Sequence, residues 1–206
     1  MGRNGAGKST TLKTIMGLMD KRQGKIDFMG QDISLSSPHD IARIGLGFVP
    51  EDRRIFTDLT VLENLEVGRQ AARVWPQGDP APHWTPEKLF KLFPNLGEMP
   101  HRPGGRMSGG EQQMLTIGRA LMTNPDVLIL DEATEGLAPL IAREIWRICS
   151  VIKDSGISSI IVDKNWKHVT QITNRNVILV KGEVVFEGSS ESLQAQPDIM
   201  AQHLGV

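Results

Sequence analysis

The stretch GRNGAGKST, residues 2–10, places glycine, lysine and serine at fixed spacings. Gly2, Gly7, Lys8 and Ser9 fit the pattern G-x-x-x-x-G-K-[ST], in which glycines let the backbone curve until its N–H groups surround a phosphate. The residues that follow carry apolar side chains at helical spacing, so a helix is expected to begin near Lys8 and to direct its positive end at the same phosphate. The pattern predicts a phosphate-binding loop; the alternative is a glycine-rich surface turn.

Side-chain chemistry within this loop assigns roles to two residues. The Lys8 ammonium can reach the β- and γ-phosphates of a nucleotide, and the Ser9 hydroxyl can bind Mg²⁺. The residues expected to surround the phosphates are Gly2, Asn4, Gly5, Ala6, Gly7, Lys8, Ser9 and Thr10.

A second motif is VLILDE, residues 127–132, an apolar run that ends in two carboxylates. Ligands of open α/β sheets bind at the carboxyl ends of the strands, so both acids are expected there. Asp131 would hold the Mg²⁺ shell, and Glu132 would accept a proton from the attacking water. The alternative, a helix cap or a solvated turn, is disfavoured by the phosphate loop in the same chain.

A third motif is MSGGEQQ, residues 107–113. Ser108 and Glu111 have the spacing of a capping box, so a helix is expected to start at Ser108 and to offer a second anion site at its N-terminus. The alternative is an ordinary capped helix behind a glycine turn. Because the chain already has one phosphate loop, a second such site suggests two chains that share a nucleotide.

The order of apolar runs indicates an α/β fold with a mainly parallel sheet. Helix starts are expected at Ser37, Thr60, Thr85 and Ser108, each a capping residue before a helical pattern. Strands are expected at 24–30, 45–49, 126–130, 157–162 and 176–180, the last leading into a hairpin, with helices at 10–18 and 140–154. The stretch from 58 to 120 has little strand pattern and is expected to be a helical insert.

Composition excludes several classes of protein. The 206 residues carry a net charge of −1, so no basic excess points to nucleic acid as a partner. Cys149 is the single cysteine, so no disulfide can form within the chain. No run of apolar residues is long enough to span a bilayer. If the protein acts at a membrane, it is expected to do so through a partner protein.

The three motifs together resemble Walker A, the signature motif and Walker B of the ATP-binding subunits of ABC transporters. The resemblance covers essentially the whole chain and implies ATP and Mg²⁺ as cofactors. It also implies a P-loop NTPase (RecA-like) core in residues 1–57 and 121–206, with an inserted helical subdomain in residues 58–120. GFVPEDRRIFTDLTVLENL and IIVDKNWKHV further resemble the branched-chain amino-acid importer branch, although urea and amide importers have similar subunits.

The resemblance implies a head-to-tail pair of ATPase subunits on the cytoplasmic face of the membrane. Ser108, Gly109 and Gly110 would contact the γ-phosphate bound on the partner chain. The segment Glu51–Gly68 would contact a membrane permease. Candidate contacts within that segment are Arg53, Arg54 and Phe56, and the alternative for the two arginines is simple solvated charge.

Two positions depart from the family pattern. Glu51 stands where most relatives carry Gln; its carboxylate can still bind a water of the Mg²⁺ shell, but it adds negative charge beside the phosphates. Lys164 stands where most relatives carry a switch His, and it can pair with the γ-phosphate. His168, one helical turn further on, is the alternative for that place.

Family members also carry strands and an adenine-stacking aromatic residue ahead of the phosphate loop. The chain is therefore expected to lack a natural N-terminal segment and to bind MgATP weakly in this form. The leading functional hypothesis is an ATPase that energises import of branched-chain amino acids. The alternatives are an ATPase for urea, amides or a lipid-linked cargo, and a regulatory partner subunit that hydrolyses little.

Overall fold

The computed structural model describes residues 1–20, 23–75 and 78–205. The strands are β1 (Asp27–Phe28), β2 (Gln31–Asp32), β3 (Leu46–Val49), β4 (Val127–Asp131), β5 (Ser158–Val162), β6 (Arg175–Val180) and β7 (Glu183–Ser189). The helices are α1 (Lys8–Ile15), α2 (Pro38–Arg43), α3 (Val61–Val67), α4 (Pro86–Leu92), α5 (Pro94–Gly97), α6 (Gly109–Leu121), α7 (Pro139–Asp154), α8 (Trp166–Ile172), α9 (Ser190–Gln194) and α10 (Pro197–Leu204). None of these described helices is long and apolar enough to cross a bilayer.

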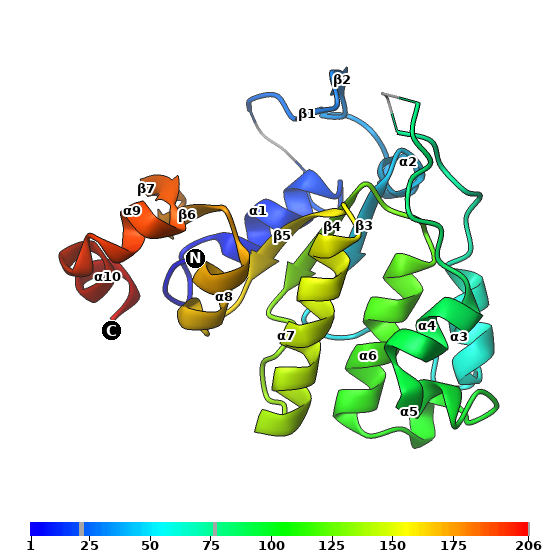
Figure 1. Cartoon of the computed structure of the whole chain (residues 1–206). Coiled ribbons are helices and arrows are strands. Elements are labelled where there is room, and N and C mark those ends of the chain that lie inside the picture. Colours follow the sequence, from blue (N-terminus) through cyan, green and yellow to red (C-terminus); the bar gives the residue numbers. More distant parts are fainter. Residues whose placement is uncertain (21–22, 76–77, 206) are drawn as a thin grey trace.

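A parallel sheet in the order β3-β4-β5 lies at the centre of the molecule (Figure 1). Its middle strand is the predicted apolar run, and Leu128, Ile129 and Leu130 are fully buried there. A strand buried on both faces reads as a continuous apolar run, because helices remove both of its faces from water. The predicted α/β class is thereby confirmed.

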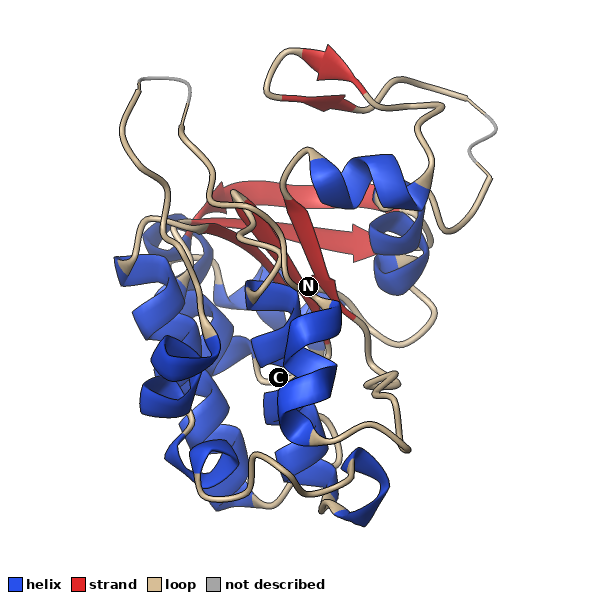
Figure 2. Cartoon of the chain, turned by 90° about the vertical axis from the view of Figure 1, so that its right-hand side faces the viewer, coloured by secondary structure: helices blue, strands red, loops and turns tan. Residues whose placement is uncertain are grey.

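The two faces of the sheet pack against different helices. Ile129 belongs to an apolar cluster with Leu12 of α1 and Ile41 of α2. Leu128 and Leu130 point the other way, into a larger cluster that includes α6 and α7. Figure 2 shows the strands in red between a large group of helices and a smaller one. The alternation along β4 therefore sets which helices lie on which side.

The four expected helix starts are all present. The side chains of Ser37, Thr60, Thr85 and Ser108 each accept a hydrogen bond from the backbone N–H three residues further on. Thr60 and Ser108 are complete capping boxes, because the glutamate three residues later also accepts from the capping residue's own N–H. Local capping chemistry was therefore enough to place these helices.

One expected strand differs in the structure, and another lies outside the parallel sheet. The run 24–30 is not one strand: Asp27 accepts from Gly30 N–H at 2.9 Å, and the resulting turn, with Gly30 at φ 82°, leaves only the short antiparallel pair β1–β2. The strand over 176–180 exists as β6 and forms the expected hairpin with β7, and this hairpin is a separate two-stranded sheet. Lys181 and Gly182 make its hairpin turn with φ values of 50° and 87°.

The β6–β7 hairpin also anchors the beginning of the described chain. The Met1 amino group donates to Val177 O at 2.6 Å, and Leu179 N–H donates to Met1 O at 2.9 Å. Gly2 lies so close to β6 that a Cβ there would stand 2.4 Å from Leu179 O. The loop that leads to α1 is thereby held against β6. The expected upstream strand stays a prediction.

Among the described residues between β3 and β4, the regular elements are helices, as expected for residues 58–120. Among the described residues of that stretch, extended pairing is limited to the isolated bridges Thr60–Pro103 and Val74–Pro80. Residues 76–77 of this stretch lie outside the described residues. Leu89 of α4 and Leu128 of β4 share one apolar cluster, so the helical segment packs continuously with the core. The division into subdomains stays a prediction.

Candidate active site

The phosphate loop, residues 2–10, curves around the N-terminus of α1. Gly5 and Gly7 have φ values of 77° and 98°, the left-handed region that glycine adopts without steric cost. Gly7 precedes α1 without any side-chain cap, so the first N–H groups of that helix remain available to an anion. The loop forms one wall of a cavity of about 290 Å³.

The cavity brings together groups that are far apart in the sequence. Asn4, Gly5, Ala6, Gly7, Lys8, Ser9 and Thr10 line it from the phosphate loop, and Glu51, Glu132, Glu135 and Lys164 line it from the ends of the parallel strands. Glu51 and Lys164, the two departures from the family pattern, therefore line the same cavity as the phosphate loop. Their roles stay predictions.

Lys8 is a buried cation, 7% exposed. Its Nζ donates to Gly2 O at 3.0 Å and to Arg3 O at 3.2 Å, and it lies 3.6 Å from Glu132 Oε1. These oxygens stabilise the ammonium group within the loop, where phosphate oxygens could take their place. The role of Lys8 toward the phosphates stays a prediction.

Ser9 and Asp131 meet although 122 residues separate them. Ser9 Oγ donates to Asp131 Oδ1 at 3.0 Å. Asp131 is 1% exposed, burial raises the pKa of its carboxyl, and its Oδ2 has no hydrogen-bond partner within the part of the chain that is described. A buried carboxylate with one unsatisfied oxygen beside a serine hydroxyl fits the hard oxygen ligands that Mg²⁺ prefers.

Glu132 follows Asp131 in a strained backbone conformation, with φ 49°. Its N–H donates to Val162 O of β5 at 2.7 Å, which holds the residue at the edge of the sheet. Burial, together with the neighbouring Glu135 carboxylate, raises the pKa of Glu132 to about 7. A carboxylate with such a pKa is suited to accept a proton near neutral pH.

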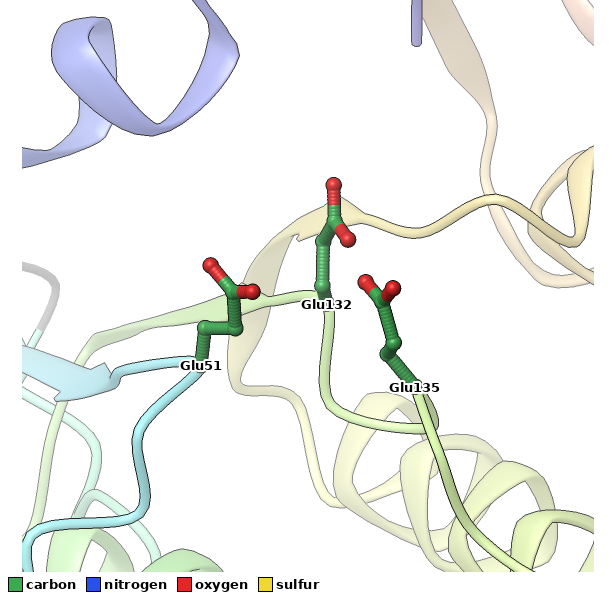
Figure 3. Close-up of side chains that lie close together, drawn as sticks. All are labelled: Glu51, Glu132 and Glu135. Atoms are coloured by element: carbon green, nitrogen blue, oxygen red, sulfur yellow. The ribbon is translucent and has the colours of Figure 1, made fainter. Parts of the chain in front are cut away.

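Glu135 is a site residue that the sequence interpretation missed. Figure 3 shows its carboxylate pointing toward those of Glu132 and Glu51, and the ligand oxygens of these three residues lie within 4.8 Å of one another. Lys164 Nζ forms an ion pair with Glu135 Oε1 and lies 3.7 Å from Glu132 Oε2. The available signal was position alone: Glu135 lies three residues after Glu132 in the same short loop.

The residues of the signature motif lie outside this cavity. Ser108 is exposed, and its hydroxyl accepts from Glu111 N–H at 3.4 Å. The two glycines that follow also have packing reasons: a Cβ at Gly109 would stand 2.9 Å from Arg53 Nη1, and one at Gly110 would stand 2.7 Å from Ile141 Cγ2. Within one chain, therefore, the fold does not bring the signature helix to the phosphate loop.

His168 does not line the cavity either. Its ring stacks on Trp146 at 5.4 Å between centroids, and Trp146 is a core residue. Of the two candidates for the switch position, Lys164 lines the cavity and His168 does not, and the role of Lys164 stays a prediction. On the nearby surface, Arg54 Nε pairs with Asp52 at 2.8 Å, so part of the expected arginine pair is engaged locally.

Comparisons with known proteins agree with this geometry. The sequence profile of the ABC transporter family matches residues 1–135. The high-affinity branched-chain amino acid transport ATP-binding protein BraG of Pseudomonas aeruginosa is 37% identical over 205 residues, which span 100% of this chain and 86% of that protein. The lipopolysaccharide export system ATP-binding protein LptB of Haemophilus influenzae is 32% identical over 207 residues, which span 100% and 84%.

A solved structure gives the same result for the fold. The ADP conformation of an ATP-binding cassette of an ABC transporter superposes with a TM-score of 0.75 at 28% identity, over 97% of this chain and 84% of that chain. The phosphate loop, the Ser9–Asp131 contact and Glu132 thus lie in a nucleotide-binding fold of known type. The chain belongs to the ABC transporter family, as one of its ATP-hydrolysing subunits.

Proposed function

We propose that this ATPase energises the import of branched-chain amino acids from the cytoplasmic face of a membrane. The observation that supports this choice of cargo is the similarity to BraG, which extends over the whole chain at 37% identity. The local resemblance of GFVPEDRRIFTDLTVLENL to the same importer branch supports it.

The cavity residues divide the chemistry of ATP hydrolysis among themselves. Lys8 would move from its carbonyl partners to the β- and γ-phosphates, and the loop N–H groups would bind the remaining oxygens. Ser9 and Asp131, with Glu51 through water, would hold Mg²⁺, which neutralises phosphate charge when bound. Glu132 Oε would accept the proton of the attacking water.

The completed site would include a second chain. Ser108, Gly109 and Gly110 lie outside the cavity of their own chain, and the α6 N-terminus behind them is suited to an anion. In a head-to-tail pair they would contact the γ-phosphate held by the partner's loop. The location of Ser108 on an exposed surface supports this arrangement.

The segment Glu51–Gly68 would contact the permease. Phe56 is 48% exposed. The guanidinium carbon of Arg119 lies over the Phe56 ring, 5.0 Å from the ring centroid. Thr116 Oγ1 of α6 donates to Arg53 O at 2.8 Å. The segment therefore contacts α6 directly. A displacement of the segment by the permease would be transmitted to α6, the helix whose N-terminus carries Ser108.

A second candidate keeps the ATPase but changes the cargo. The 32% identity to LptB favours a lipid-linked cargo over urea or amides. A regulatory subunit with little hydrolysis is the third candidate, and Lys164 at the switch position favours it.

Glu132→Gln tests the chemistry. Because the amide cannot accept the proton, we expect steady-state phosphate release to fall by about 10² or more. Glu144→Gln, in an exposed pair with Arg147 outside the cavity, is the matched control and should hydrolyse at the wild-type rate. A wild-type rate as low as that of Glu132→Gln would favour the regulatory candidate instead.

Uptake of labelled leucine by cells that lack this chain tests the cargo. Wild type should restore uptake, and Glu132→Gln should not. Unchanged uptake in the deleted cells would contradict the cargo assignment while leaving the ATPase assignment intact.

A further inference from the structure

The loops that follow β4 and β5 are fastened together at the edge of the cavity. Thr134 Oγ1 donates to Asp163 Oδ2 at 2.6 Å, and Asn165 N–H donates to Asp163 Oδ1 at 2.9 Å. Asp163 is only 7% exposed, so these bonds lie away from water. The backbones that carry Glu135 and Lys164 are therefore held in a defined relation.

The side chain of Lys164 has fewer constraints than its backbone. It is 49% exposed and carries its charge on a flexible four-carbon stem. Without a partner, the ammonium group would sample many positions, most of them in solvent. Its ion pair with Glu135 Oε1 and its approach to Glu132 Oε2 at 3.7 Å instead direct it into the cavity.

Of these two acids, Glu135 is the better anchor. Glu132 is 9% exposed and is already shared with Lys8, whose Nζ lies 3.6 Å from Oε1. Glu135 is 35% exposed and is neither the proposed base nor a proposed Mg²⁺ ligand, although its carboxylate contributes to the raised pKa of Glu132. An ion pair with Glu135 therefore holds the lysine without occupying the proposed base, although Glu51 adds further negative charge nearby.

We propose that Glu135 is a positioning residue, whose carboxylate holds the Lys164 ammonium beside Glu132, where that cation meets the terminal phosphate of the nucleotide. The inference rests on the proposed role of Lys164 and adds the residue that makes the role possible. Figure 3 shows the placement of Glu135 beside Glu132 that this requires. The alternative hypothesis is that the Lys164–Glu135 contact is an ordinary exposed ion pair with no effect on turnover.

A double-mutant cycle on the whole chain distinguishes the positioning role of Glu135 from an ion pair without effect. The variants are Glu135→Gln, Lys164→Gln and the double variant, with kcat and KM for MgATP measured for each. Lys164→Gln and Glu135→Gln should each lower kcat by about threefold or more, within the range of couplings between contacting residues. KM should change little, because the lysine acts on the terminal phosphate in the transition state.

The decisive variant is the double one. If Glu135 acts through Lys164, Glu135→Gln should have no further effect once Lys164 is glutamine. Glu135→Asp, which keeps the charge, should recover part of kcat, and Glu144→Gln should match wild type. Thermal unfolding midpoints should be unchanged in all variants, because the pair is exposed.

Three results would overturn the inference. An impaired Lys164→Gln together with an unaffected Glu135→Gln overturns the role of Glu135 alone. Two single effects that multiply in the double variant show that Glu135 acts independently of the lysine. An unaffected Lys164→Gln removes the proposed role of Lys164, and with it this inference, while a loss of turnover in Glu132→Gln would still support the ATPase chemistry.

Discussion

At the scale of single residues, the site depends on groups in unfavourable surroundings. Glu132 combines a left-handed backbone with a side chain 9% exposed, and Asp131 leaves a buried oxygen unsatisfied. Strain and unpaired charge of this kind cost stability and persist where the surrounding structure holds them. For Glu132, the Val162 carbonyl of β5 accepts its N–H, and the cations Lys8 and Lys164 lie beside its carboxylate.

Burial has a different consequence at Cys149, where it makes the side chain unreactive. It is 4% exposed on α7, and burial raises the pKa of its thiol to about 12. The thiol is therefore protonated near neutral pH, where very little of the nucleophilic thiolate forms. We expect iodoacetamide at pH 8 to leave the native chain unmodified and to alkylate it once urea unfolds it.

Mass spectrometry gives a direct reading, because the chain has a single cysteine. Rapid and complete alkylation of the native chain would contradict the burial of Cys149.

At the scale of elements, α6 joins the helical segment to the sheet. Its N-terminus carries Ser108, and along its length it contacts α3, α5 and β3. Leu115 and Ile117 are fully buried in these contacts. The helix therefore owes its position to packing, while its start is set by the capping box.

Leu115→Ala should destabilise the chain by about 2–5 kcal/mol, because it removes buried methyl groups and leaves a cavity. Leu140→Ala on α7 is the matched control: Leu140 is 72% exposed, and the same substitution there should change the free energy of unfolding by at most about 0.5 kcal/mol. Urea denaturation measures both. Equal losses would contradict the position of α6 in the core.

At the scale of the whole molecule, the two regions that are proposed to bind anions lie apart on one chain. The loop and the carboxylates line one cavity, and Ser108 is exposed outside it. A nucleotide that uses both regions would require two chains. The proposed pairing therefore predicts an assembly that depends on ATP.

In the Glu132→Gln background, which slows hydrolysis, MgATP should convert the chain from monomer to dimer in sedimentation velocity. Ser108→Asp should prevent this, because aspartate still caps α6 but repels the γ-phosphate. Thr60→Asp makes the equivalent change at the other capping box, on α3, and should leave dimerisation intact. Dimers that form equally well with Ser108→Asp would refute the shared site.

The amino-acid order was sufficient wherever interactions are local. The phosphate loop, the buried strand at 126–130 and the capped helix starts follow from spacing, apolar patterning and side-chain bonds to backbone atoms three residues away. Such interactions are complete within a few residues, so no distant partner is needed to predict them. They account for the α/β class and for most of the candidate site.

The contacts that complete the site arise only from the register of the sheet. Parallel pairing sets Asp131 opposite Val162, so the loops after β4 and β5 leave the sheet side by side. That is why Glu135 meets Lys164, 29 residues away, although neither shows any local pattern that predicts the pair. The β6–β7 hairpin itself was expected, but its separation from the parallel sheet was not, because the neighbours of a strand depend on packing over the whole chain.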